Sequence, residues 1–233
     1  DRGGVSLPDR AGVEIGGALM IWSLIVKATV ETGYMVGVAL ILSALVGIPL
    51  GILLVITAPR HIKPLPLLHR VLSVVINVGR SLPFIILLVA IIPFTRWLVG
   101  TSIGTAGAIV PLTISAIPFM ARVVESALLE IDWGVIEAAQ AMGGSTRQII
   151  AKVLIPEAVP GLVLGVTMVA VSLISYSAMA GAVGGGGLGD LAIRYGYQRF
   201  RGDIMFWTVL VLVVIVQGLQ SFGGWLAAKL NHR

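Results

Sequence analysis

Long uncharged apolar stretches, separated by short polar segments, dominate the pattern of side chains along the chain. Five of them are long enough to cross about 30 Å of hydrocarbon as α-helices, and they cover residues 33–56, 73–93, 104–121, 158–180 and 204–228. The third is the shortest and contains two prolines, whose freed carbonyl groups neighbouring helices can satisfy. Residues 209–216 are apolar on every side, whereas strands of a membrane barrel alternate apolar and polar residues. The pattern therefore predicts an all-α polytopic membrane protein with five transmembrane helices.

The pattern before and after these spans predicts three smaller segments. Residues 1–17 are polar and contain glycine, unlike a signal peptide or a spanning helix, and we expect them to be flexible or partly of non-native origin. The apolar run within residues 18–32 is too short to span and carries Lys27, which favours a short interfacial helix leading into the first span. Residues 33–228 then form one transmembrane domain, and residues 229–233 form a tail.

Composition excludes a soluble enzyme and a disordered chain. Of the 233 residues 57% are hydrophobic and only 12% charged, whereas a soluble domain places charge at roughly a quarter of its positions. The net charge of +5 comes from basic residues scattered over loops and ends without a basic helix or an aromatic platform, so contacts with membrane lipid are favoured and nucleic acid is not expected. There is no cysteine and the three histidines lack a ligand spacing, so no metal site is predicted.

The segment 127–157 carries the most informative pattern between two spans. Its centre reads Glu137-Ala-Ala-Gln-Ala-Met-Gly143, and Val153-Leu-Ile-Pro156 follows. This predicts a short helix with Glu137 in its first turn, where a carboxylate is favourable, then a glycine break and a second helix that ends before Pro156. Small side chains at Ala138 and Ala139 allow another protein surface to approach closely. An ordinary solvated amphipathic helix is the alternative for such a loop.

The wider spacing of this segment resembles the signature loop of bacterial ATP-binding-cassette (ABC) importer permeases. That signature is Glu-Ala-Ala, three residues, Gly, nine residues and Ile-x-Leu-Pro, and the matching positions here are Glu137, Ala138, Ala139, Gly143 and Pro156. Val153 and Ile155 replace the Ile and Leu conservatively. In the family this loop is cytoplasmic and docks as a coupling helix into a groove of the ATPase subunit. The resemblance implies a bacterial inner-membrane protein with its N-terminus outside and its C-terminus in the cytoplasm, whereas basic residues, equally divided between the two sides, do not decide the orientation.

Further segments narrow the resemblance to the permeases of methionine importers. They are residues 77–88, 92–96, 100–104, 109–113 and 176–184, and the likeness runs from about residue 30 to 228. It implies the type I ABC importer permease fold and a homodimer that moves methionine by alternating access. The implied partners are two cytoplasmic ABC ATPase subunits, which hold ATP and Mg, and an external methionine-binding lipoprotein. No cofactor is implied on this chain.

The residues themselves bear on the energy source. A phosphate-binding P-loop needs Gly-Lys followed by Ser or Thr, and the chain contains no Gly-Lys pair, so ATP hydrolysis must occur on another polypeptide. Arg80 is the one charged residue inside the five predicted spans, where it anchors the span, pairs with a carbonyl group or lines the path. Permeation of another small amino acid, or ion-coupled secondary transport, remains an alternative function, and a non-transporting scaffold is the weakest one.

A glycine-rich segment at residues 181–189 cannot form a stable helix facing lipid. Non-helical backbone at this depth must be buried in protein or line an aqueous cavity, so we expect a substrate path or external gate, with a plain flexible loop as the alternative. The residues assigned to this path or gate are Tyr176, Ser177, Met179, Gly184, Gly185, Gly186 and Gly187. Glycines four apart at 33/37, 47/51, 100/104 and 161/165 further predict close helix packing.

Overall fold

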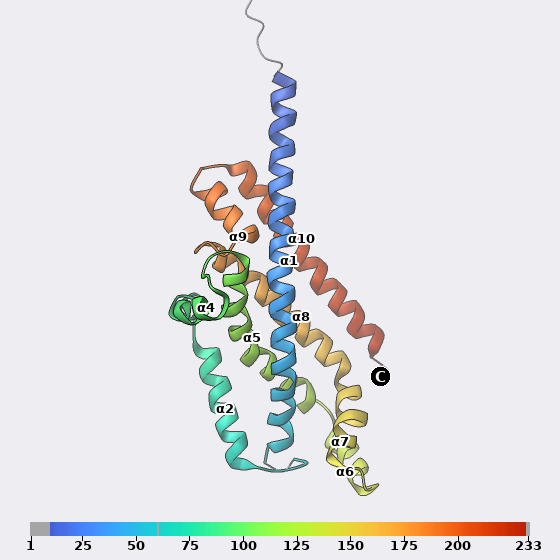
Figure 1. Cartoon of the computed structure of the whole chain (residues 1–233). Coiled ribbons are helices and arrows are strands. Elements are labelled where there is room, and N and C mark those ends of the chain that lie inside the picture. Colours follow the sequence, from blue (N-terminus) through green and yellow to red (C-terminus); the bar gives the residue numbers. More distant parts are fainter. Residues whose placement is uncertain (1–9, 60, 232–233) are drawn as a thin grey trace, which may run out of the picture.

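The computed structural model of the chain describes residues 10–59 and 61–231, with side chains from residue 20 onward. This part of the chain is almost wholly helical and contains no strand (Figure 1). The elements in chain order are α1 (Arg10–Thr57), α2 (Pro66–Ser81), α3 (Phe84–Ala90), α4 (Ile92–Val99), α5 (Gly104–Leu129), α6 (Trp133–Ala141), α7 (Thr146–Ile149), the π-helix η1 (Ile150–Leu154), α8 (Ile155–Gly181), α9 (Gly187–Leu191), the π-helix η2 (Ala192–Tyr197) and α10 (Gly202–Leu230).

Four helical stretches of the described chain are long and apolar enough to cross a membrane, and they contain four of the five predicted spans. They are Met20–Thr57, Gly104–Leu129, Thr146–Gly181 and Gly202–Leu230. The predicted continuous span 73–93 is wrong, because α2 and α3 meet there at 96° and make a crossing only as a broken pair. Pro83 explains the break, since it lacks an N–H group and holds Leu82 in an extended conformation, with φ −82° and ψ 124°.

The separate interfacial helix predicted at residues 18–32 is also absent, because α1 runs unbroken from Arg10 to Thr57. Ile25 and Ala28 of its first half are buried against Leu188, Leu191 and Ile204, which come from the far end of the sequence. This packing stabilises the first half of α1, so the helix continues past residue 32, where we expected a boundary. Of the predicted polar segment, residues 10–17 begin α1 and residues 1–9 lie outside the described residues.

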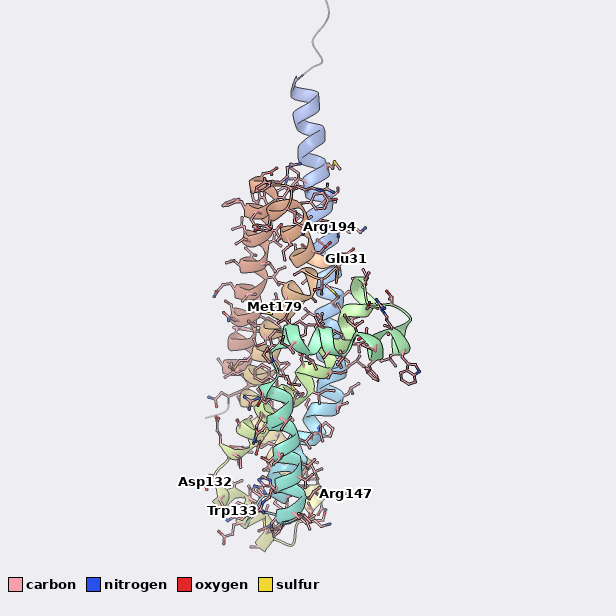
Figure 2. All side chains as sticks on the ribbon, turned by 90° about the vertical axis from the view of Figure 1, so that its left-hand side faces the viewer. Glu31, Asp132, Trp133, Arg147, Met179 and Arg194 are labelled. Carbon is pink, nitrogen blue, oxygen red and sulfur yellow. The ribbon has the colours of Figure 1, made fainter. Side chains whose placement is uncertain are left out.

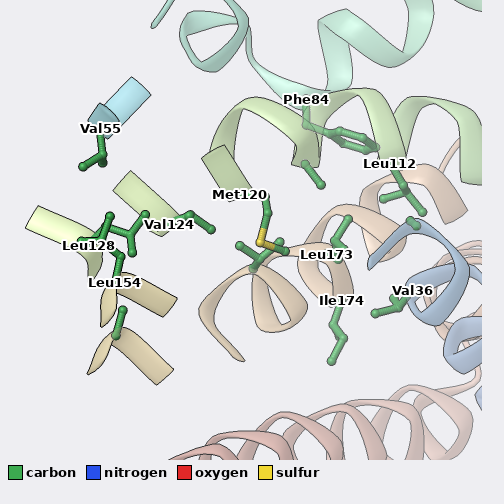
Figure 3. Packing of buried hydrophobic residues seen from close by; sticks show 14 of the residues in the cluster. Val36, Val55, Phe84, Leu112, Met120, Val124, Leu128, Leu154, Leu173 and Ile174 are labelled. Carbon is green, nitrogen blue, oxygen red and sulfur yellow. The ribbon is translucent and has the colours of Figure 1, made fainter. Parts of the chain in front are cut away.

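The core lies where α1, α5 and α8 pack on one another (Figure 3). Met120, Leu128, Leu154 and Leu173 are fully buried there. α5 packs on both α1 and α8, which also contact one another, and α10 packs on α8. α1 and α5 run towards the end of the bundle where α6 and α7 lie, and α8 runs back from it (Figure 1).

Small residues permit two of these helix contacts. A Cβ added at Gly47 would lie 2.6 Å from Met120 Cβ, and one at Gly165 would lie 2.0 Å from a methyl carbon of Val123. The predicted glycine packing is therefore confirmed for 47/51 and for 161/165. The prediction is wrong for the pairs 33/37 and 100/104, because a Cβ added at any of these four glycines would meet open space. Gly100 instead caps α4, and Gly104 begins α5.

An ion pair lies on α5, which extends to Leu129 beyond the predicted end at residue 121. Arg122 pairs with Glu125 and donates hydrogen bonds to Ser73 Oγ at 2.9 Å and to Asn77 Oδ1 at 2.8 Å. The pairing reduces the cost of both charges and lets the apolar helix continue. The sequence had indicated that Arg80 is the one charged residue inside the spans. Because α5 is longer than predicted, Arg122 and Glu125 also lie on a spanning helix.

Candidate coupling segment and substrate path

The predicted coupling residues lie at one end of the molecule. Figure 2 shows Asp132, Trp133 and Arg147 together at this end, while Glu31 and Arg194 lie in the opposite half. Asp132 caps α6, because its Oδ1 accepts a hydrogen bond from the Gly134 N–H group at 2.6 Å. Ser145 caps α7 in a capping box with Gln148. The Ser-x-x-Gln spacing is a sequence signal for that second start, and our sequence interpretation missed it.

α6 presents one buried face and one exposed face. Ile136 and Ala139 are buried against the bundle, whereas Glu137 and Ala138 are exposed. Trp133, Val135 and Met142 are exposed large apolar side chains on or beside the same helix. An exposed apolar surface with a small residue and an acid among its members is suited to docking a partner protein. We predicted Glu137 in the first turn of this helix. The prediction is wrong, because α6 begins at Trp133 and Glu137 is its fifth residue.

The chain reverses direction between α6 and α7 at Gly143. Its φ of +78° lies in the left-handed region, which favours glycine. The Gly143 N–H group donates to the Gln140 carbonyl oxygen at 2.9 Å, and the Gly144 N–H group donates to the Ala139 carbonyl oxygen at 3.1 Å. The predicted glycine break is thus present.

Pro156 does not end the second helix, contrary to prediction. α7 continues through the π-helix Ile150–Leu154 into α8, where Pro156 is the second residue. A local π-turn is a known way for a helix to adapt to interrupted hydrogen bonding, as the missing N–H group of proline requires. Continuous helix therefore joins α7 to the spanning helix α8, whereas the turn at Gly143 separates α7 from α6.

The loop between α1 and α2 supports α6 through an aromatic contact. The His61 and Trp133 rings meet edge to face with centroids 5.2 Å apart. His61 Nδ1 is buried and has no hydrogen-bond partner among the described residues, and burial lowers the pKa of this imidazole. His61 is distant from α6 in sequence, so no local pattern could have indicated this contact.

The glycine-rich segment is held firmly by two other helices. Glu31 Oε2 accepts a hydrogen bond from the Gly187 N–H group, and Thr32 Oγ1 accepts one from the Leu188 N–H group, each at 2.9 Å. The Gly184 carbonyl oxygen accepts a third from the Gly104 N–H group at 2.8 Å. Gly185 and Gly187 are buried. The non-helical backbone that we predicted is present at residues 182–186, but a helix resumes at Gly187.

Glu31 and Thr32 were missed as partners of this turn. Their sequence signal is an acid and a hydroxyl in adjacent positions of a largely apolar helix, although nothing local identifies what they bind. Their hydrogen bonds tie the turn to α1.

The other three predicted path residues do not converge on one cavity. The Tyr176 ring stacks on Phe84 with centroids 4.8 Å apart and lines a cavity of about 200 Å³. Ser177 is buried, and its hydroxyl donates to the Ile174 carbonyl oxygen within α8. Met179 instead lines an apolar groove of about 710 Å³ between α8 and α10. Successive residues of a helix point about 100° apart, which separates these side chains.

Comparison with known families identifies the fold just described. Residues 47–233 match the family described as "Binding-protein-dependent transport system inner membrane component". The chain belongs to this family. It is thus a permease, and the family resemblance that the coupling loop indicated is confirmed.

Individual relatives of this permease agree with the family match. The "Probable D-methionine transport system permease protein MetI" of Vibrio cholerae is 54% identical over 210 residues, which are 90% of this chain and 93% of that protein. The "D-methionine transport system permease protein MetI" of Escherichia coli K12 is 52% identical over 162 residues, 70% of this chain and 74% of that protein.

Solved structures confirm the all-α membrane fold of the permease. A structure described as "Inward facing conformations of the MetNI methionine ABC transporter" matches with a TM-score of 0.89 and 47% identity, over 91% of this chain and 98% of that one. A crystal structure of an amino acid ABC transporter with histidines matches with a TM-score of 0.75 at 16% identity, which shows a common fold alone.

Proposed function

We propose that this permease is the membrane subunit of an ATP-driven importer that moves methionine across the bacterial inner membrane by alternating access. The observation that carries the proposal is the 47% identical match, over 91% of the chain, to a methionine ABC transporter. Relatives named D-methionine permeases support the same substrate. Because the chain has no Gly-Lys pair, ATP and Mg bind to a separate ATPase subunit.

In this proposal two copies of the chain pair, and each α6 docks into a groove of one of two cytoplasmic ATPase subunits. Trp133, Val135 and Met142 supply exposed apolar contact, and Ala138 permits close approach. A displacement of α6 passes through the turn at Gly143 to α7, which continues through η1 into α8. ATP drives the cycle because it binds with different affinity to the two arrangements of the paired bundles.

The same proposal places the α6 end in the cytoplasm and the glycine-rich end outside. The N-terminus of the chain is then external and its C-terminus cytoplasmic. Tyr197 and Phe200 are exposed near the glycine-rich end, where Arg194 pairs with Asp190. These groups offer apolar and charged contacts to an external methionine-binding lipoprotein, and the turn at Gly184, Gly185 and Gly186 forms part of the external gate.

The test is uptake of labelled methionine into vesicles that contain the permease, its ATPase and the delivery protein. We expect accumulation that requires all three proteins and ATP. Accumulation by the permease alone, driven by an ion gradient, would instead indicate secondary transport. Competition by unlabelled amino acids decides the substrate, and strong competition by an amino acid other than methionine would contradict the assignment.

A further inference from the structure

Two cavities that share residues follow one face of α5 and α8 from the middle of the bundle towards α6. The first, of about 200 Å³, is lined by Arg80, Phe119 and the polar side chains Ser115, Ser172 and Tyr176, with Phe84. The second, of about 390 Å³, shares Arg80 and Phe119 and continues past Arg122, Ser126 and Glu130. The α5 members recur every three or four residues, so they form one stripe along that helix.

This stripe has the position of a solute path. Ser115 lies roughly 16 Å along α5 from its first residue, since each helical residue rises about 1.5 Å, and the stripe ends at Glu130, next to the segment that leads into α6. Polar side chains placed deep in a spanning bundle usually face a cavity or another protein surface.

Arg80 differs from the other arginine of this stripe. Arg122 is neutralised by Glu125 and bonded to Ser73 and Asn77. No hydrogen bond or ion pair from Arg80 to any other described residue is found, although Arg80 lines both cavities. Arg80 is exposed, so its guanidinium group is accessible from both cavities, and the last turn of α2, where Arg80 lies, offers it only the partial negative charge of a helix end.

We propose that Arg80 binds the carboxylate of the transported amino acid at the corner between α2 and α3. This inference rests on the proposed function and deepens it. The guanidinium group presents five N–H donors in a planar fork that matches a carboxylate with two parallel hydrogen bonds. The cavity of about 200 Å³ shares Arg80 and Phe119 with the cavity of about 390 Å³, so a solute can pass from one to the other. The larger cavity leads on towards the cytoplasmic end.

The remaining lining residues fit the rest of an apolar amino acid. The Ser115, Ser172 and Tyr176 hydroxyl oxygens can accept hydrogen bonds from an ammonium group. The stacked rings of Phe84 and Tyr176, with Phe119, offer aromatic surface to a thioether, and sulfur makes favourable contacts with such rings. A zwitterion with an apolar side chain is therefore the class of ligand that this site takes.

The experiment compares Arg80→Gln with Arg96→Gln in vesicles that contain the complete transporter. Arg96 is a matched control, because it is an exposed arginine near another cavity and donates a hydrogen bond to Ser102. We expect Arg80→Gln to reduce ATP-dependent methionine uptake by roughly tenfold or more, which is the scale of losing a charge-assisted pair. ATP hydrolysis without substrate should persist in both variants, and Arg96→Gln should transport normally. Normal uptake by Arg80→Gln would overturn the proposal.

Two further experiments distinguish carboxylate binding by Arg80 from other roles of its charge. Arg80→Lys keeps the charge but loses the fork of N–H donors, so uptake should fall several-fold with unchanged ATP hydrolysis. If Arg80→Gln does not assemble, Arg80→Lys decides the question. Uptake by Arg80→Lys equal to that of the wild type would then contradict the proposal. If Arg80 held the headgroup of an anionic lipid instead, the Gln defect would vanish in vesicles of phosphatidylcholine alone, whose headgroup has no net charge, and that result would also overturn the proposal. Failure of the wild-type transporter to accumulate methionine at all would refute the proposed function itself.

Discussion

At the scale of single residues, Gly187 joins a backbone requirement to a close contact. Its φ is +75°, and a Cβ added there would lie 2.6 Å from Thr32 Oγ1, the atom that accepts the Leu188 N–H group. We predict that Gly187→Ala destabilises the protein by about 1–2 kcal/mol from the backbone conformation alone, with a further cost from the contact. The melting temperature of the purified transporter should fall by several degrees. Gly202→Ala, where a Cβ would meet open space, should change it little, and equal effects would contradict the interpretation.

His61 predicts a pH dependence at the same scale. Burial lowers the pKa of His61 below 6.5, so the unfolded chain binds a proton more readily than the folded one. The stability that this neutral imidazole contributes is complete above pH 6.5 and is lost as the pH falls from 6.5 through the lowered pKa. We expect the melting temperature of the wild type to fall more over this acid range than that of His61→Phe, which keeps a ring against Trp133. Parallel curves for the two proteins would show that His61 does not titrate in this way.

Glu137 and Gly143 carry the prediction for coupling. Replacing Glu137 by Ala removes an exposed carboxylate from the proposed docking face, and Gly143→Val places a branched side chain at φ +78°. Each should lower ATP-dependent uptake by roughly tenfold while the transporter still hydrolyses ATP. Gln220→Ala, at an exposed position of α10, is the control. Wild-type uptake by the assembled Glu137 and Gly143 variants would argue against the docking role.

At the scale of elements, α6 and α7 have separate caps and should respond separately to losing them. Asp132→Ala should raise hydrogen exchange in α6, because a lost N-cap costs about 1 kcal/mol, or roughly fivefold in local opening. Ser145→Ala should do the same in α7 and leave α6 protected. Exchange measured by mass spectrometry on peptides from the two helices distinguishes these outcomes, and a common rise in both helices would mean that the segment opens as one unit.

The helices of the bundle show why the length of apolar runs predicted some features of the fold and not others. The spans at 158–180 and 204–228 follow from long runs of apolar residues, and α8 and α10 contain them. The bend at Pro83 depends on whether neighbouring helices support a break, which a single proline does not reveal, since Pro111 and Pro118 lie inside an unbroken α5. The continuity of α1 and the Arg80 cavities depend on contacts between residues far apart in sequence, so no local pattern contains them.

At the scale of the whole molecule, the absence of cysteine makes the orientation directly measurable. A single cysteine at Met142 or at Phe200, which are 83% and 91% exposed, would carry the only thiol of the chain. In intact spheroplasts a membrane-impermeant maleimide should label Phe200→Cys and not Met142→Cys. The reverse pattern would place the coupling segment outside and contradict the proposed topology.

The central claim is that α6 of this permease is held by a separate ATPase. A photoreactive cross-linker on Met142→Cys, activated after assembly of the transporter in membranes, tests it most directly. We predict a covalent product with the ATPase from Met142→Cys and none from the same cross-linker on Phe200→Cys. An assembled transporter in which only the Phe200 position cross-links to the ATPase would contradict the account.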